Sequence, residues 1–332
     1  MSHILLLGAG FSRNWGGLLA DEVFDDLIGQ SEVAQDEYLK TLLWKHRTAG
    51  GFESALEDAQ VAFAANPATA ALSLQRLQSA IFNTFERMNR AFFNAPTMEF
   101  QSHIEIMIRT FLARFDAIFT LNQDVLLEHH YLHQIELTAP NKWRGAQLPG
   151  LQRRPSVSVT TNPSWGRDVW IPVEKSSFRI DDGLQPYFKL HGSSNWRDSD
   201  GGQLMVLGGN KYSAIRAHPI LGWYFEQFRL HLSQPASKLF VIGYGFRDRH
   251  VNDVIVESVQ NRGLRFFVID SCGSDVVRRA NSSYRGSIYC PTDLDDAFRQ
   301  GLIGASRRGL SEIFGNDQVA HEQVSSFFTD GV

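Results

Sequence analysis

The sequence predicts an α/β protein with a Rossmann-like parallel sheet, helices on both faces of that sheet and an inserted helical module. Six short apolar runs are continuous rather than alternating, as expected for parallel strands that are buried on both faces. Most of these runs are separated by segments long enough for crossover helices, which is typical of a doubly wound fold. The runs cover residues 4–7, 117–120, 187–190, 239–242, 266–269 and 288–290.

The composition is that of a globular protein with a large core. The chain has 332 residues, of which 43% are hydrophobic and 20% are charged, so it is not expected to be disordered. Lysine and arginine number 32 against 36 aspartate and glutamate residues, which gives a formal net charge of −4. A general nucleic-acid binder shows a strong basic excess, so we expect contact with nucleic acid only through a partner.

Cysteine usage and the N-terminal sequence indicate the cellular compartment in which the protein is expected to be found. Cys272 and Cys290 are too few for a four-cysteine zinc site or a disulfide framework, which fits a reducing environment. The apolar stretch 4–11 is far shorter than the ~20 residues needed to cross a bilayer, and no basic leader precedes it. We therefore expect a soluble, cytoplasmic protein without membrane contact and without zinc.

A helical module is expected between the first two strands. Two sets of apolar residues recur every three or four positions, so each set forms one stripe along a helix. Breaks at Asn66-Pro67 and Pro96-Thr97 separate the helices. We predict an inserted module over 36–115 and a sheet domain over 1–35 and 116–332. The stripes consist of Leu74, Leu77, Ile81, Phe85, Met88 and Phe92, and of Ile104, Met107, Ile108, Phe111, Leu112 and Phe115.

Two further segments differ in character from the strands and the module. Residues 138–186 contain six prolines, which indicates an irregular excursion, with room for a hairpin, over one end of the sheet. Long loops of this kind in compact domains are often functional. The tail from residue 293 onward is predicted to be helical.

The first apolar run leads directly into a glycine-rich turn, Gly8-Ala9-Gly10-Phe11-Ser12. Such a turn between strand and helix lets backbone N–H groups approach a phosphate closely. The third glycine of the dinucleotide-binding fingerprint is replaced by Arg13, and no acidic residue ends a second strand ~20 positions on. A glycine turn that serves tight packing alone is the alternative.

The second run ends in Thr120-Leu121-Asn122-Gln123-Asp124. Polar residues at the carboxyl end of a parallel strand face the ligand crevice. Asn122 can donate and accept hydrogen bonds, and an ionised Asp124 accepts them. Both residue types are also favoured helix N-caps, and an apolar helical segment begins at Val125, so capping is the alternative.

The third run leads into His191 and the small residues Gly192 and Ser193. A histidine at a strand end, followed by a flexible turn, is well placed to act as a general base near pH 7. A core histidine with its hydrogen bonds satisfied is the alternative.

The fourth and fifth runs also end in polar residues. Gly243 and Tyr244 follow the fourth run, and glycine there permits close approach of the backbone to a ligand. Asp248 and His250 could ligate a metal, but two ligands with no matching cluster elsewhere do not predict a metal site. Asp270 ends the fifth run, where its carboxylate could meet a ribose or cap a helix.

Four of these segments occur in the order found in a known family. GAGFS, TLNQD, KLHGS and IGYGFRDRHVND resemble the GAG-x-S, T-x-N-x-D, catalytic HG and bacterial IGYSF-x-D-x-H-x-N signatures of SIR2-like proteins. The resemblance covers the sheet domain and not the helical module.

The sequence also departs from the sirtuin pattern. It lacks the CxxC…CxxC zinc module, reads NWGGLLA where sirtuins carry a GIPDFR-like segment, and reads LMVLGGNK where they carry an FGE-like segment. It is more similar to the SIR2-like domains of bacterial antiphage systems. That group typically hydrolyses NAD+, some members work with an Argonaute protein or a HerA-type ATPase, and many form homo-oligomers.

The resemblance implies an NAD+ glycohydrolase that releases nicotinamide and ADP-ribose. It implies that Asn122 orients the ribose or the attacking water, that Asp124 contacts the nicotinamide carboxamide, and that His191 is the base. It implies that Gly8, Gly10 and Ser12 hold the phosphates and that Tyr244 and Asp270 contact the adenosine half. Ala9, Phe11 and Gly243 complete the implied set of cofactor-binding residues.

Two other functions remain open at this point. A protein deacylase or ADP-ribosyltransferase would use the same cleft with a different acceptor. A non-catalytic sensor would bind NAD+ or ADP-ribose and control a partner, but it would keep the glycine turn without the base. Because both Asn122 and His191 are present, the sensor is disfavoured.

Overall fold

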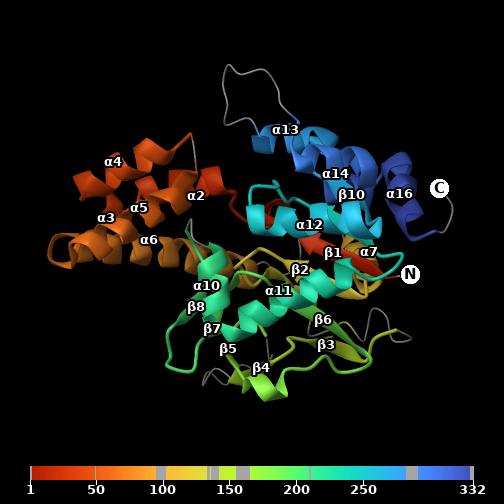
Figure 1. Ribbon diagram of the computed structural model, residues 1–332, viewed down its shortest axis with the longest axis horizontal. Helices are drawn as coiled ribbons and strands as arrows, with labels where there is room; N and C mark the ends of the chain where they lie inside the picture. Colours follow the sequence, from red (N-terminus) through yellow and green to blue (C-terminus); the bar gives the residue numbers. More distant parts are fainter. Residues whose placement is uncertain are drawn as a thin grey trace.

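The computed structural model describes residues 2–48, 50–94, 102–132, 135, 142–154, 165–208, 211–281 and 291–329. In this part of the chain, one parallel sheet has the strand order β11-β10-β9-β1-β2-β6-β3. Helices cover it (Figure 1), so the α/β, Rossmann-like fold class is confirmed. The strands are β1 (His3–Leu7), β2 (Ala117–Thr120), β3 (Gly145–Gln147), β6 (Leu184–Lys189), β9 (Lys238–Ile242), β10 (Arg265–Ile269) and β11 (Leu302–Ser306).

The strand order places a topological switch point beside β1. From β1 the chain builds outward through β2 on one side and later through β9 on the other. Ligands of doubly wound folds bind outside the carboxyl ends of the strands at such a point. The loops that follow β1, β2 and β9 therefore converge at one edge of the sheet.

Five of the six predicted runs overlap strands of this sheet, and the run at 288–290 lies outside the described residues. The prediction of an all-helical tail was wrong at β11, which pairs with β10. β11 has the sequence LIGAS and is mostly half-buried, because it is an edge strand. An edge strand needs no continuous apolar run, and so no such run predicted β11.

A second, smaller sheet with the order β4-β5-β7-β8 covers one end of the molecule. β4 and β5 are antiparallel, which is the hairpin allowed for in 138–186. The strands are β4 (Leu151–Arg154), β5 (Val169–Pro172), β7 (Gly192–Arg197) and β8 (Gln203–Met205). The step from β6 of the large sheet to β7 of the small one passes through His191.

Helices pack on both faces of the large sheet. On one face, Phe228 of α11 (Pro219–Leu232) packs edge-on against Phe119 of β2, and α12 (Arg249–Arg262) and α14 (Asp293–Gly301) continue this layer. On the other face, Phe111 of α7 (Ser102–Ala113) packs against Phe240 of β9. Short helices near the C-terminus, α15 (Leu310–Ile313) and α16 (Gln318–Ser325), complete that side.

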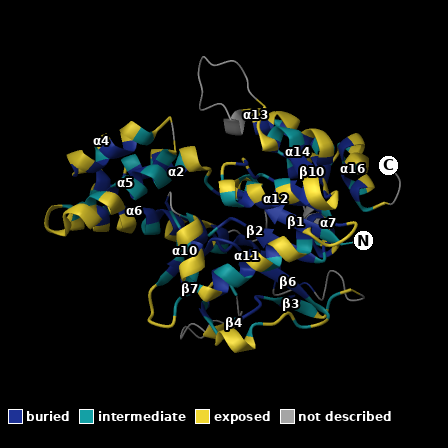
Figure 2. Ribbon diagram, viewed as in Figure 1, coloured by how far each residue is buried: buried dark blue, intermediate teal, exposed yellow. Residues whose placement is uncertain are grey.

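The helices α2 to α6 form a cluster to one side of the sheet (Figure 1). Their buried residues face one another while exposed residues occupy the outer faces of α4 and α6 (Figure 2). The cluster consists of α2 (Ala20–Ile28), α3 (Ser31–Ala34), α4 (Glu37–His46), α5 (Gly51–Ala65) and α6 (Pro67–Asn94). α2 and α3 precede residue 36, and the division of the chain into domains stays a prediction.

The apolar spacing of the first predicted stripe places its side chains in the core. Leu74, Leu77, Ile81, Phe85, Met88 and Phe92 of α6 are all buried. Among the described helices, none is long and apolar enough to cross a bilayer.

Candidate functional site

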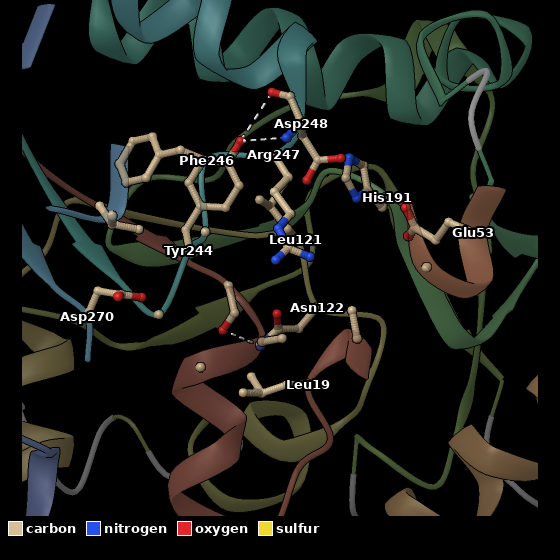
Figure 3. Close-up of a pocket in the computed structure, with 18 of the residues that line it drawn as sticks. Leu19, Glu53, Leu121, Asn122, His191, Tyr244, Phe246, Arg247, Asp248 and Asp270 are labelled. Atoms are coloured by element: carbon tan, nitrogen blue, oxygen red, sulfur yellow. Dashed lines mark hydrogen bonds between the residues drawn. The ribbon is translucent and has the colours of Figure 1, made fainter. Parts of the chain in front are cut away.

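A cavity of about 2180 Å³ opens at the carboxyl ends of β1, β2, β9 and β10 and extends to the helical cluster. Figure 3 shows part of it, with Asp270 at one end and His191 at the other. Nine of the eleven predicted site residues line this cavity. They are Gly8, Ala9, Gly10, Asn122, Asp124, His191, Gly243, Tyr244 and Asp270.

The glycine turn after β1 packs directly against the turn after β9. The Gly8 N–H donates to the Ile242 carbonyl at 3.0 Å and the Gly10 N–H to the Gly243 carbonyl at 2.9 Å. A Cβ on Gly8 would lie 2.5 Å from the Gly243 oxygen, and Gly243 itself has φ +63°. This backbone contact requires the glycines. Tight packing therefore explains their presence as well as phosphate binding does.

The other two predicted residues of this turn, Phe11 and Ser12, do not line the cavity. Phe11 is buried and packs against Trp15, with ring centroids 5.0 Å apart. The Ser12 hydroxyl donates to Asp124 Oδ2 at 2.8 Å. Ser12 therefore acts on the site through Asp124.

Asn122 joins the loops after β1 and β2. Its Nδ2 donates to the Gly8 carbonyl and to Ser12 Oγ, both at 3.0 Å. Because both Nδ2 hydrogens have protein acceptors, Oδ1 is the group that Asn122 can offer to a ligand. Asp124 is committed on both oxygens, since Oδ1 accepts from the Leu126 N–H at 3.1 Å. The N-cap of α8 (Leu126–His130) is Val125, so neither Asn122 nor Asp124 is the cap that the alternative expected.

A fully buried ion pair, Lys189–Glu128, supports the loop after β2 that carries Asn122 and Asp124. Lys189, the last residue of β6, lies 2.5 Å from Glu128 Oε1, and both side chains have no exposed area. Lys189 also donates to the Asp124 carbonyl, and Tyr187 donates to Glu128 Oε2 at 3.4 Å. Burial raises the pKa of Glu128, and the adjacent Lys189 ammonium opposes that shift. The lysine is thus held where it fixes the Asp124 backbone.

His191 is buried at the other end of the cavity, with 1% of its surface exposed. Burial lowers the pKa of its imidazole from 6.5 to about 3, and Asp248 partly offsets this while Lys211 and His250 add to it. Its Nε2 lies 3.0 Å from Nε2 of His250, so one ring donates to the other. The core-histidine alternative and the catalytic hypothesis therefore both fit, because the ring is buried and faces the cavity.

A charged network surrounds His191. Lys211 Nζ lies 2.7 Å from Asp248 Oδ1 and 2.8 Å from Glu53 Oε2. Figure 3 shows Asp248 and Glu53 on opposite sides of His191. Burial raises the pKa of Glu53, whereas the neighbouring cations and Lys211 hydrogen bond outweigh burial and lower the pKa of Asp248. Three distant segments of the chain supply these charges.

The loop after β9 is held in an unusual conformation. Phe246 has φ +52°, and its carbonyl accepts from Asn252 Nδ2 at 2.8 Å. The Tyr244 hydroxyl is 2.8 Å from Asn252 Oδ1 and also accepts from the Asp248 N–H. A non-glycine residue in the left-handed region is strained, and such strain persists where the surroundings determine it. Tyr244 therefore positions Asp248.

Asp270, at the end of β10, lies beside the tip of β11. Its N–H donates to the Ser306 carbonyl at 3.1 Å, and Oδ1 accepts from the Cys272 N–H at 2.8 Å. Arg307 and Arg308 line the cavity next to it. Only one carboxylate oxygen is used by this turn, and so the other can accept from a ribose hydroxyl.

The helical cluster also reaches the site, which the sequence did not indicate. Asn89 of α6 donates to Ser194 Oγ at 2.8 Å and accepts from the Val125 N–H at 3.1 Å. Glu53, at the start of α5, lines the cavity. Asn89, Glu53 and Lys211 have no local motif around them, so only the folded arrangement reveals their role.

The fold and the cavity define a doubly wound α/β protein with a ligand site at its switch point. Residues 116–288, just over half of the chain, match the SIR2-like domain. The chain therefore belongs to the SIR2-like domain family. A search of curated proteins finds no match.

The matched range contains Asn122, Asp124, His191, Tyr244 and Asp270, and it begins after the glycine turn. SIR2-like domains are generally NAD-dependent enzymes that use NAD as a substrate. The expectation of NAD-related chemistry is confirmed at that level.

Proposed function

We propose that the protein is an NAD+ glycohydrolase that cleaves NAD+ to nicotinamide and ADP-ribose. The observation that carries the proposal is the single cavity that Asn122 and His191 share with Gly8 and Asp270. A dinucleotide lying along it would place its adenosine half near Asp270 and its nicotinamide ribose near Asn122.

In the proposed reaction the bond between nicotinamide and ribose C1′ breaks and its electron pair leaves with nicotinamide. The sugar becomes an oxocarbenium-like cation, which the carboxylates of Asp248 and Glu53 stabilise electrostatically. Asn122 Oδ1 orients a ribose hydroxyl or the attacking water. Asp124, whose oxygens are already bonded to Ser12 and Leu126, positions Asn122 through Ser12.

His191 accepts the proton of the attacking water in this scheme. A pKa of about 3 makes it a weak base, but water bonded to a cationic sugar carbon is far more acidic than free water. The transfer then follows bond formation at C1′, and a base that remains neutral at physiological pH serves this order of events.

Incubation of the purified protein with NAD+ and identification of the products by mass tests the proposal. We expect nicotinamide and ADP-ribose, with turnover falling at least ~100-fold in Asn122→Ala and in His191→Ala, the low end for loss of a general base. His46→Ala, in the helical cluster, is the matched control. Near wild-type turnover in a folded His191→Ala protein would contradict the assignment.

A second arm of this experiment addresses the deacylase. An acetyl-lysine peptide pool added with NAD+ should leave nicotinamide release unchanged. Nicotinamide release that depends on the peptide, together with stoichiometric deacetylation, would instead establish a deacylase.

One observation favours the non-catalytic sensor as a second candidate. The base has a strongly lowered pKa and is already hydrogen-bonded to His250. A sensor would bind ADP-ribose or NAD+, measurable by calorimetry, without releasing nicotinamide.

The likeness to antiphage SIR2-like domains extends the proposal to the cell. There the enzyme would act in the cytoplasm as a homo-oligomer that depletes NAD+ during phage infection, with a HerA-type ATPase or an Argonaute protein as partner. Light scattering that shows a strict monomer with full activity would count against assembly.

A further inference from the structure

We propose that His191, Asp248 and His250 form a binding site for a divalent transition-metal ion such as Zn2+. One ligand atom from each residue lies within 4.8 Å of the other two. The sequence suggested Asp248 and His250 as ligands without a third, and the fold supplies that third ligand from the loop after β6.

The spacing of the two imidazoles suits a shared ion. The two Nε2 atoms are 3.0 Å apart. Two metal–nitrogen bonds of about 2.1 Å, at angles between about 90° and 110°, separate their nitrogens by roughly 3.0 to 3.4 Å. The rings can therefore bind one ion with little movement, provided that both carry their proton on Nδ1.

The charges around the rings favour a cation. Two carboxylates, Asp248 and Glu53, face the single ammonium of Lys211, and Arg247 is exposed, so that solvent screens its charge. A cluster with more carboxylates than buried cations attracts a divalent ion.

Lys211 supports the third ligand rather than replacing it. It bonds to Oδ1 of Asp248 at 2.7 Å, which leaves Oδ2 for an ion. Carboxylates that ligate metals are typically held by hydrogen bonds of this kind. Imidazole nitrogen with one carboxylate oxygen is a ligand set that Zn2+ and Co2+ accept.

An ion at this position would occupy His191 Nε2 and remove it from proton transfer. Zn2+ would then inhibit the enzyme rather than support it. This consequence rests on the proposed function, whereas the binding site itself does not.

Titration of the chelator-treated protein with Co2+, followed by its visible absorption, tests binding without any assay of activity. We expect one Co2+ per chain, displaced by Zn2+. Loss of a residue that merely supports a ligand typically costs about 10- to 100-fold in affinity, so loss of a ligand in His250→Gln or Asp248→Asn should weaken binding by at least about 10-fold. His46→Gln is the matched control, because His46 also faces a carboxylate, with its Nε2 2.7 Å from Asp58, but no third ligand joins them among the residues that the structure describes. It should bind Co2+ as the wild type does.

Two results would overturn the site: no saturable Co2+ spectrum in the folded wild type, or unchanged affinity in folded His250→Gln. If the variants do not fold, long-range NMR of the histidine nitrogens in the wild type decides, since Zn2+ should shift the Nε2 signals of two rings. Unshifted rings would also overturn the site. Zn2+ that binds without slowing nicotinamide release would leave the site intact and contradict its inhibitory role.

Discussion

At the glycine end of the cavity the contacts that shape the site are between backbones, whereas at the histidine end they are between charged side chains. Gly8 and Gly10 touch Gly243 with no side chain between them. His191 instead lies among Asp248 and other groups that come from distant segments. The glycine end depends on the lack of Cβ atoms, which lets the two backbones touch. The histidine end depends on the pairing of Lys211 with the carboxylates of Asp248 and Glu53.

This difference predicts different sensitivities. Any added carbon should disrupt the glycine end, while the histidine end should respond to pH and to loss of a charge partner. The buried Lys189–Glu128 pair is bonded to the Asp124 carbonyl, in the loop that carries Asn122, and its loss should have the largest effect.

Replacing Lys189 with Met should lower the free energy of unfolding by about 3 to 5 kcal/mol, because Glu128 is left buried without its cation. Denaturant unfolding measures the change. The double variant Lys189→Met with Glu128→Leu should recover much of the loss, since it removes both charges. Equal losses in the single and double variants would show that packing, not charge, is responsible.

At the glycine end, Gly243→Ala should cost about 3 kcal/mol. Its φ is +63° and its Cβ would lie 2.4 Å from backbone atoms of Gly10 and Phe11, so left-handed strain and overpacking add. Gly245→Ala is the control two residues away, where a Cβ meets nothing within 4 Å. It should change stability by no more than about 0.5 kcal/mol. Equal thermal shifts in both variants would refute the backbone account.

The next largest loss of stability is expected at the contact between the helical cluster and the loop after β2. Asn89→Ala should cost about 2 kcal/mol, because the buried Val125 N–H loses its acceptor. Asn83→Ala, on the same helix and bonded to Glu32 at 3.3 Å, should change stability little. If Asn89 positions the site, nicotinamide release should also fall in its variant and not in the control.

Taken per pH unit, the smallest effect is a pH dependence at the histidine end. The folded pKa of His191 is about 3 against 6.5 for the ordinary group, so below pH 6.5 the unfolded chain binds a proton that the folded chain does not. The free energy of unfolding should therefore fall by about 1.4 kcal/mol per pH unit between pH 6.5 and pH 3 on account of this residue, and be fully retained above pH 6.5.

A comparison with His191→Gln isolates that contribution. Buried histidines that do not contact His191, such as His231, act in both proteins and cancel in the difference. The wild type should therefore lose stability more steeply on acidification. Parallel stability profiles for the two proteins would show that His191 is not buried as a neutral ring.

The sequence predicted most of the large sheet because buried parallel strands are continuous apolar runs, as in 239–242. It missed the edge strand β11, whose half-exposed LIGAS lacks such a run. Asn122 and His191 could be assigned to one site from the sequence, because both follow strands of one parallel sheet, and both line the same cavity. The sequence could not place Glu53 or Asn89, because their partners are more than 30 positions away and leave no local pattern.

Through Asn89, the long helix α6 connects the helical cluster to the segments around the cavity. A 28-residue helix extends about 42 Å at 1.5 Å per residue, and helices of that length typically curve gently around the core. Asn89 lies near one end, bonded to the loop after β2 and to Ser194 of β7, while the N-terminal end of α6 lies at the outer edge of the cluster (Figure 1). A displacement of the far end of this helix would therefore be transmitted to Val125 and Ser194, which lie beside the cavity that Asn122 and His191 line.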